Sequence, residues 1–280
     1  MAIDLHCHTK LSDGSMGVEE VIALARRRNL SALAVTDHDT TASAVRAAVI
    51  GRRQGVRVIQ GVELSTWDTP RNRKAHILCY LADTPTRLEP LCRQVTEGRK
   101  KAAVEMVRKV MRYYPITPEM VAKCATGSTV VYKQHIMHAL MDAGYADSIY
   151  GEVYDKLFSK EGSIQTTVEY PDTRDALELV RAAGGIAVLA HPLLYHNEEL
   201  MMELTEQGLL DGVEAYHPSS DEKGTRDLVA YAGLHDLIVT GGTDFHGMYT
   251  SAPRPLGNSA IPVECVDALM ARKKKQKQNA

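Results

Sequence analysis

The sequence lacks any long hydrophobic run, and this absence limits the classes of protein to which it can belong. Of its 280 residues, 44% are hydrophobic and 24% are charged, as in ordinary soluble globular proteins. No run approaches the roughly 18 consecutive apolar residues of a membrane span, and the first ten residues contain no basic region followed by an apolar stretch. We therefore expect a cytoplasmic protein with a substantial core.

Features of thiol and phosphate-loop chemistry are also missing. The five cysteines are an odd number, are widely scattered and include no CxxC pair. This usage fits a reducing compartment better than a disulfide framework, and it argues against a thiolate metal site. Because the sequence has neither a glycine-rich phosphate loop nor a nucleophile elbow, it gives no sign of a covalent enzyme intermediate.

Neither acidic nor basic side chains are in large excess, since the formal net charge is −2. Only the last ten residues stand out, with five basic and no acidic side chains, and they leave the body of the chain mildly acidic. We expect residues 271–280 to form a solvated, disordered tail, with phosphate or nucleic-acid binding as the alternative. An acidic body without a long basic and aromatic track argues against long nucleic acid as a partner.

The sequence does contain short β-rich runs that alternate with helical patterns, joined by glycine or by small polar caps. This alternation is typical of βα units around a parallel sheet, either in one large barrel or in two small domains. Strands are expected at Ile3–His6, Ala32–Thr36, Val56–Gln60, His76–Tyr80, Ile186–Ala190, Gly212–Tyr216 and Leu237–Gly241. Helical spacing of the apolar residues predicts outer helices over 18–25 and 176–183.

The interval from about Thr96 to Gln165 interrupts this alternation. It predicts several helices with no convincing strand between them, over Arg99–Tyr113, Pro118–Ala125, Lys133–Ala143 and Ser148–Leu157. We therefore expect a helical insertion at residues 96–165 in a discontinuous barrel made of residues 1–95 and 166–270.

Side chains that can bind metal recur near the ends of the expected strands. Because side chains alternate along a strand with a period of two, His6 and His8 share one face and can reach one ion, whereas Cys7 points away. The candidate ligands are His6, His8, Asp13, His38, Glu63, His76, His191, Asp244 and His246. All but His76, which opens its strand, lie where a barrel places its active site. Nine independent structural roles are a poor explanation of this pattern.

These motifs together resemble the polymerase and histidinol phosphatase (PHP) family of metal-dependent phosphoesterases. The resemblance rests on Asp4–Gly14 (DLHCHTKLSDG), Thr36–Thr40 (TDHDT), Gly61–Glu63, His76, Ala190–Pro192 and Gly242–His246. It covers nearly the whole chain apart from the insertion. The resemblance implies an α/β fold, a distorted seven-stranded (βα) TIM-like barrel with three divalent metal ions at its C-terminal mouth.

The resemblance also implies how the ligands are shared. A first ion would be bound by His6, His8, Glu63 and Asp244, a second by Glu63, His76 and His191, and a third by Asp13, His38 and His246. Imidazole and carboxylate ligands without thiolate suit Mn²⁺, Fe²⁺ or Zn²⁺. The implied reaction is hydrolysis of a phosphate ester by a metal-bound hydroxide, for which Glu63 and Asp244 are essential.

Four further residues near the mouth have two interpretations each. His217, which ends the sixth strand, is the favoured candidate to protonate a leaving group, with structural packing as the alternative. Arg254 could bind a phosphate as a bidentate donor or be a solvated loop arginine. Asp37 and Asp39 could orient ligands by hydrogen bonds or cap the following helix.

The insertion would stand over the metals as a lid and decide the substrate. Relatives that dephosphorylate nucleotides commonly carry an arginine just before a histidine here, where this chain has Lys133, a point charge without the bidentate fork. Lys160 could bind a second phosphate or be part of a solvated helix face.

We predict an enzyme that hydrolyses phosphate esters of a small sugar or nucleotide, either phosphomonoesters or cyclic phosphodiesters. An exonuclease acting on short oligonucleotides is the nearest alternative. A metal-stabilised but inactive structural module is a further one, against which the complete ligand set argues.

Overall fold

The computed structural model describes residues 2–258 and 260–279, and it contains one seven-stranded sheet in which the strands follow the order of the chain. The strands are β1 (Ala2–Asp4), β2 (Leu30–Val35), β3 (Val58–Asp68), β4 (Arg73–Tyr80), β5 (Ile186–Leu189), β6 (Gly212–Tyr216) and β7 (Ile238–Gly241). All seven expected strands are present, and the α/β class with a distorted barrel is confirmed.

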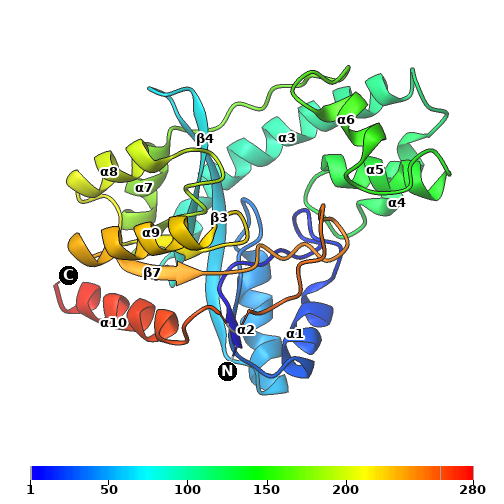
Figure 1. Ribbon diagram of the computed structural model, residues 1–280. Helices are drawn as coiled ribbons and strands as arrows, with labels where there is room; N and C mark the ends of the chain where they lie inside the picture. Colours follow the sequence, from blue (N-terminus) through cyan, green and yellow to red (C-terminus); the bar gives the residue numbers. More distant parts are fainter. Residues whose placement is uncertain (1, 259, 280) are drawn as a thin grey trace.

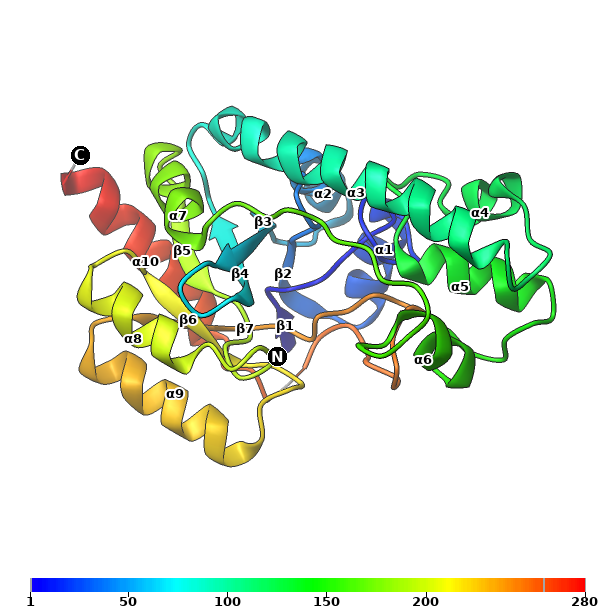
Figure 2. The ribbon, with the colours of Figure 1, turned by 90° about the horizontal axis from the view of Figure 1, so that it is seen from above.

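The helices surround this sheet and form a separate group at one side (Figures 1 and 2). Those next to the barrel are α1 (Val18–Arg27), α2 (Ala42–Gln54), α7 (Thr173–Ala182), α8 (Glu198–Glu206), α9 (Glu222–Leu234) and α10 (Glu264–Asn279). The group at the side consists of α4 (Pro118–Cys124), α5 (Lys133–Asp142) and α6 (Glu152–Phe158). A short 3₁₀ helix (Pro85–Leu88) leads into the long α3 (Glu89–Val110). In the part of the chain described, no helix is both long and apolar enough to cross a bilayer.

The expectation of a wholly parallel sheet is wrong at β4. This strand pairs antiparallel with both β3 and β5, whereas the other neighbouring strands pair in parallel. The physical reason is the four-residue turn at 69–72, which is too short for the crossover that parallel strands need. Since β4 runs in the opposite direction, His76 near its start lies at the same end of the barrel as the other candidate ligands. In the pairing of β3 with β4, His76 lies opposite Ser65, only two residues after Glu63, which confirms this position.

Irregular backbone closes the barrel between its first and last strands. The Leu5 amide donates to the Gly241 oxygen at 3.1 Å, and the Asp244 amide donates to the His6 oxygen at 2.9 Å. The two segments approach so closely that a Cβ on Gly242 would lie 2.2 Å from the Cβ of His6. Any larger residue at position 242 would therefore clash with His6. Gly242 allows the segments that follow β1 and β7 to lie side by side, and this seam between the two strands sets His6 beside Asp244.

The helices of the expected insertion share one core, to which Tyr249 from the loop after β7 also contributes, and α3 continues through residue 96 without a break. Leu91 and Cys92 of α3 pack on the barrel core, and Ala103, Met106 and Val110 of the same unbroken helix pack on α4 to α6. The insertion therefore extends from the barrel on a continuous helix (Figure 1). Tyr150 and Tyr154 pack against the core of the insertion.

The expectation of a disordered C-terminal tail is wrong for residues 271–279, which continue α10. Leu269 and Cys265 of this helix pack against the barrel core. The Lys273 ammonium lies 2.6 Å from Asp83 Oδ2, and the Lys277 ammonium lies 2.9 Å from Oδ1 of the same carboxylate. Apolar packing together with two ion pairs to one acidic side chain accounts for the order. Ala280 lies outside the described residues.

Candidate metal centre

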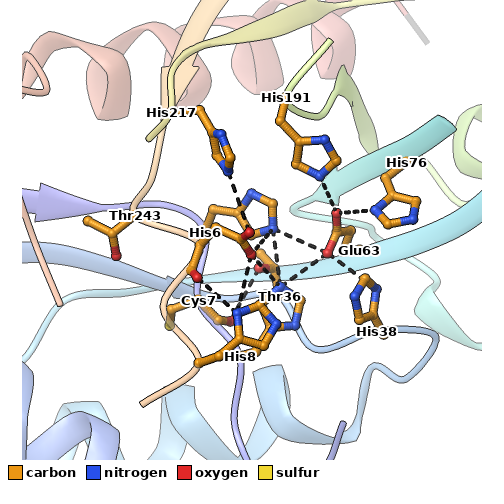
Figure 3. Close-up of polar contacts among 12 residues, drawn as sticks. His6, Cys7, His8, Thr36, His38, Glu63, His76, His191, His217 and Thr243 are labelled. Carbon is orange, nitrogen blue, oxygen red and sulfur yellow. Dashed lines mark hydrogen bonds and ion pairs between the residues drawn. The ribbon is translucent and has the colours of Figure 1, made fainter. Parts of the chain in front are cut away.

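All nine candidate ligands converge at one end of the barrel. Figure 3 labels six of them: His6, His8, His38, Glu63, His76 and His191. The first expected set meets around one oxygen of Glu63. Glu63 Oε2 lies 3.2 Å from His6 Nε2 and 3.1 Å from His8 Nε2. Asp244 Oδ1 lies 3.4 Å from His8 Nε2 and 3.6 Å from His6 Nε2.

The other oxygen of Glu63 faces the second expected set. Oε1 lies 2.8 Å from His76 Nδ1 and 3.0 Å from His191 Nε2. Glu63 is inside β3 rather than just past its end, because the hairpin extends this strand to Asp68. A carboxylate with each oxygen directed at a different group of histidines has the geometry of a bridging ligand.

The third expected set surrounds Asp13. Its Oδ1 lies 3.1 Å from His246 Nε2, and its Oδ2 lies 4.0 Å from His38 Nε2. His8 belongs to this group as well, since its Nδ1 lies 3.6 Å from Asp13 Oδ1. His38 Nδ1 lies 3.2 Å from Glu63 Oε2, the oxygen that faces the first set, so His38 stands between the first and third sets.

Two ligands occupy unusual backbone conformations. His191 has a φ of 26° and Asp244 a φ of 51°. Such conformations are unfavourable for residues other than glycine, although aspartate tolerates the left-handed region better than most residues, and they cluster at functional sites. They follow β5 and β7 and turn the two side chains into the centre.

Buried carboxylates that sequence reasoning missed orient these ligands. Glu214 on β6 accepts a hydrogen bond from His6 Nδ1 at 3.0 Å and another from the His191 amide at 2.9 Å. Asp4 accepts from the amides of His6 and Thr243. A carboxylate that fixes one imidazole nitrogen leaves the other free to bind an ion. An acidic residue inside an otherwise apolar strand was the available signal for Glu214.

Asp37 and Asp39 also support the centre, and neither caps α2, whose N-cap residue is Thr41. Asp37 accepts from the Thr9 amide at 2.7 Å and from Ser12 Oγ at 2.5 Å. Asp39 accepts from the Ser65 amide at 2.9 Å.

The donor set fits divalent metal ions. His6 Nε2 and His8 Nε2 point at each other across 3.2 Å. Asp13 Oδ1 and His38 Nδ1 are buried and form no hydrogen bond of acceptable geometry among the described residues, since their neighbours, His246 Nε2 at 3.1 Å and Glu63 Oε2 at 3.2 Å, are themselves candidate ligands. Unpaired buried polar atoms are costly, and a cation that accepts their lone pairs removes that cost.

The protonation states of the metal-free centre differ from residue to residue. Burial raises the pKa of Glu63, but the imidazoles of His38 and His6 outweigh it and hold that pKa well below its ordinary value. Burial lowers the pKa of His76 to about 4. Burial opposes protonation of His8, but hydrogen bonds to Asp244 and Glu63 outweigh it and raise the pKa of His8 to about 10. At neutral pH the metal-free centre therefore has an ionised bridging carboxylate, a neutral His76 and a protonated His8, whose proton an incoming ion must displace.

His217 and Arg254 both lie at the centre. His217 Nε2 and Arg254 Nη1 each lie 3.5 Å from Asp244 Oδ2. The Ser219 amide donates to His217 Nδ1 at 3.1 Å, which places the proton of a neutral imidazole on Nε2.

The two expected lysines lie elsewhere in the insertion. Lys133 Nζ donates to the Phe158 oxygen at 3.2 Å and lies over the Phe158 ring. Lys160 is exposed on the turn after α6. Their contribution to substrate binding stays a prediction.

Sequence reasoning missed a group of cations and aromatic rings beside the centre. The Arg99 guanidinium lies over the rings of Tyr132 and Tyr170, and Lys74 Nζ lies 5.7 Å from the centroid of Tyr170. The ring of Tyr132 stacks near His38, with 6.5 Å between the centroids. Burial, with repulsion from Arg99 and Lys133, lowers the pKa of Lys74 to about 8. No side chain of this group belongs to a sequence motif.

The chain matches known proteins over most of its length. The model of the PHP domain matches residues 4–182. The phosphoribosyl 1,2-cyclic phosphate 1,2-diphosphodiesterase of Eggerthella lenta is 36% identical over 90% of this chain and 97% of that protein. The 3′,5′-nucleoside bisphosphate phosphatase of Chromobacterium violaceum is 28% identical over 87% of each chain. A 5′-3′ exoribonuclease of Haemophilus influenzae is 30% identical over 87% of this chain and 89% of that protein.

A solved structure has the same architecture. The crystal structure of a protein from Bifidobacterium adolescentis, described as a metal-dependent phosphoesterase, matches with a TM-score of 0.84 and 25% identity over 96% of each chain. The fold and the buried histidines and carboxylates define a metal-dependent hydrolase. The chain belongs to the PHP family of metal-dependent phosphoesterases. It is a phosphoric ester hydrolase.

Proposed function

We propose that the centre binds three divalent ions in the sets implied by the sequence, with Mn²⁺, Fe²⁺ or Zn²⁺ as the ions that suit these ligands. The observation that carries the proposal is the division of Glu63, whose two oxygens face different histidines. When bound, the ions polarise the phosphoryl oxygens and lower the pKa of water. Glu63 and Asp244 supply negative charge that holds the ions together.

His217 is the proposed proton donor to the leaving-group oxygen. To act as this donor His217 is an imidazolium: its Nδ1–H can donate to the Ser219 hydroxyl oxygen, 2.6 Å away, and its Nε2–H is directed at the side of Asp244. Transfer of the Nε2 proton to the leaving-group oxygen then leaves a neutral imidazole. Arg254 lies on the same side and can donate to a phosphoryl oxygen once substrate displaces its contact with Asp244.

The proposed substrate is a small phosphorylated sugar or nucleotide with a second anionic group. Two relatives support this class of substrate. One is named for a phosphoribosyl cyclic phosphate and the other for a nucleoside bisphosphate. Lys74 and Arg99 add positive charge close to His76 and His38, and Lys133 and Lys160 can extend it. The exoribonuclease relative makes short oligonucleotides the second candidate.

A hydrolysis assay of metal-loaded protein tests the function. Release of inorganic phosphate reports hydrolysis of monoesters, and chromatography of the products reports hydrolysis of cyclic diesters and of the oligonucleotide, because cleavage of a diester bond leaves a monoester and frees no phosphate. The panel pairs cyclic diesters and monoesters that carry a second phosphate with analogues that lack it, and adds a short oligonucleotide. We expect kcat/KM to be highest for a two-phosphate small molecule. Turnover of the oligonucleotide above all small esters would favour an exonuclease, and no turnover of any ester would contradict the function.

Variants separate substrate binding from chemistry in the same assay. Arg254→Ala and Lys133→Ala should lower kcat/KM by about tenfold to a hundredfold, as expected for loss of a charge-assisted contact of about 1.5–3 kcal/mol. Metal content should be unchanged. The loss of kcat/KM in Lys133→Ala should be confined to substrates with the second phosphate. Equal losses on the substrates with and without that phosphate would show that Lys133 does not contact it.

A further inference from the structure

A second group of metal-binding side chains lies in the insertion, away from the nine ligands of the catalytic centre. Cys124 ends α4, and His138 and Asp142 lie one turn apart on α5. Cys124 Sγ lies 4.0 Å from Asp142 Oδ2, and His138 Nε2 lies 3.6 Å from Asp142 Oδ1. One atom from each of the three residues lies within 4.8 Å of the others. These separations are those of ligands around one ion.

The histidine of this group is held by its other ring nitrogen. His138 Nδ1 lies 2.8 Å from the Tyr249 hydroxyl, and the tyrosine ring also packs edge-on against the imidazole. When Nδ1–H donates to the hydroxyl oxygen, Nε2 carries a lone pair directed at Asp142. Metal-binding histidines in proteins are oriented by such a hydrogen bond.

We propose that Cys124, His138 and Asp142 form an additional divalent-metal site, selective for Zn²⁺ or another thiophilic ion. The proposal does not depend on the phosphoesterase centre, which has no thiolate ligand. Thiolate, imidazole and carboxylate together suit Zn²⁺ better than Mn²⁺ or Mg²⁺. Cys124 and His138 are partly exposed and Asp142 is more than half exposed, so an ion can enter and a water molecule can complete four-coordination.

Absence of a CxxC pair is the reason that the sequence predicts no thiolate site. Here the ligands come from two helices, and the folding of the insertion brings Cys124 to the i and i+4 pair on α5. Burial and the nearby Asp142 raise the pKa of Cys124, so the thiol is protonated until an ion displaces the proton. Binding therefore releases a proton.

The site is connected to the catalytic centre through Tyr249. This tyrosine is buried in the insertion core, and its amide donates to the oxygen of His246, one of the nine ligands, at 3.3 Å. An ion on Cys124, His138 and Asp142 would tie α4 to α5 and fix the partner of Tyr249. The site would thus brace the loop that follows His246.

Cobalt titration tests the proposal on the whole protein. The catalytic centre is first filled with excess Mn²⁺, and Co²⁺ is then added while absorbance is followed. Because a Co²⁺–thiolate bond gives a near-ultraviolet charge-transfer band and imidazole–carboxylate coordination does not, the band reports only a cysteine ligand. We expect a band that saturates near one equivalent and that Zn²⁺ abolishes.

Conservative variants identify the residues that give rise to the absorption band. Cys124→Ser should abolish it, and Asp142→Asn should weaken Co²⁺ binding by at least about tenfold. Cys7→Ser, a thiol next to the catalytic histidines, should leave the band unchanged. Persistence of the band in Cys124→Ser, or no band in the unmodified protein, would overturn the proposal. Neither result would alter the hydrolysis assay, so the two proposals fail separately.

Discussion

Glu63 is the residue on which the proposed metal centre should depend most, because two groups of histidines contact its carboxylate. Glu63→Gln keeps the shape and removes the charge. We expect kcat to fall by at least about a hundredfold and metal content to fall with it. The hydrolysis assay and elemental analysis of the same sample measure both. Cys7→Ala is the matched control, since the Cys7 thiol points away and donates to the Ala34 oxygen. An active Glu63→Gln variant with full metal content would contradict the bridging role.

If the second anionic group of the substrate contacts Lys74, titration of this lysine should make substrate binding depend on pH. Its pKa is lowered to about 8, so the positive charge is complete below that pH and is lost as the pH rises through it. We expect KM for a two-phosphate substrate to rise between about pH 7 and pH 9. Lys74→Met should raise KM at the lower pH and remove this part of the dependence. The substrate analogue without the second phosphate is the control, and an identical pH profile for both substrates would contradict the contact.

At this scale the sequence predicted which side chains come together at the barrel mouth, because their motifs are short and local. His6 and His8 follow from strand periodicity, and the TDHDT and GTDFH segments supply His38, Asp244 and His246. Glu214 and Arg99 stand alone in their elements, and only the closed barrel brings them to the centre. Their roles depend on contacts between distant segments, which no local spacing encodes.

At the scale of elements, α3 is the helix that connects the barrel core with the core of the insertion. Gly98 is inside this helix at the end of the barrel-packed part, where it costs helix stability. A Cβ at Gly98 would meet Val168 Cγ1 at 3.4 Å, an ordinary contact. Gly98→Ala should therefore raise the free energy of unfolding by about 0.5–1 kcal/mol. Urea denaturation measures this change.

The same variant tests whether α3 bends during turnover. We expect kcat to stay within about twofold, because a continuous helix carries the insertion as a rigid arm. Lys101→Gly, an exposed position on the same helix, is the control for propensity and should destabilise by a similar amount. A large loss of kcat in Gly98→Ala with gained stability would show that bending at Gly98 is needed.

Helices and strands were predicted well where a complete residue pattern marks the element. They were predicted less well where pairing with another segment decides the direction or the order of the element. The seven strands were all located, yet the direction of β4 depends on the turn at 69–72, which the expected strand ends left as part of a longer gap. The tail was assigned to solvent from its charge alone. Asp83, which pairs with Lys273 and Lys277, is about 190 residues away in sequence and could not be anticipated.

At the scale of the whole molecule, the metal ions should contribute to stability as well as to catalysis. Ions that bind only the folded chain stabilise it by about 2.7 kcal/mol at a concentration of a hundred times Kd. Chelation should lower the Tm, and adding Mn²⁺ back should restore it with about three ions per chain in the catalytic centre. Glu63→Gln should show a much smaller difference between the two states. Full stability after complete metal removal would contradict this coupling.

The seam between β1 and β7 has a consequence for the order of folding. Glu63 and His76 belong to one hairpin, so their half of the centre needs only a short loop to close and can form early. His6 and Asp244 come from opposite ends of the chain, and they meet only when the barrel closes. Nascent chains can therefore hold a preorganised Glu63–His76 pair long before they can hold the complete centre. Catalytic competence is acquired last, at the step that joins the two ends of the chain.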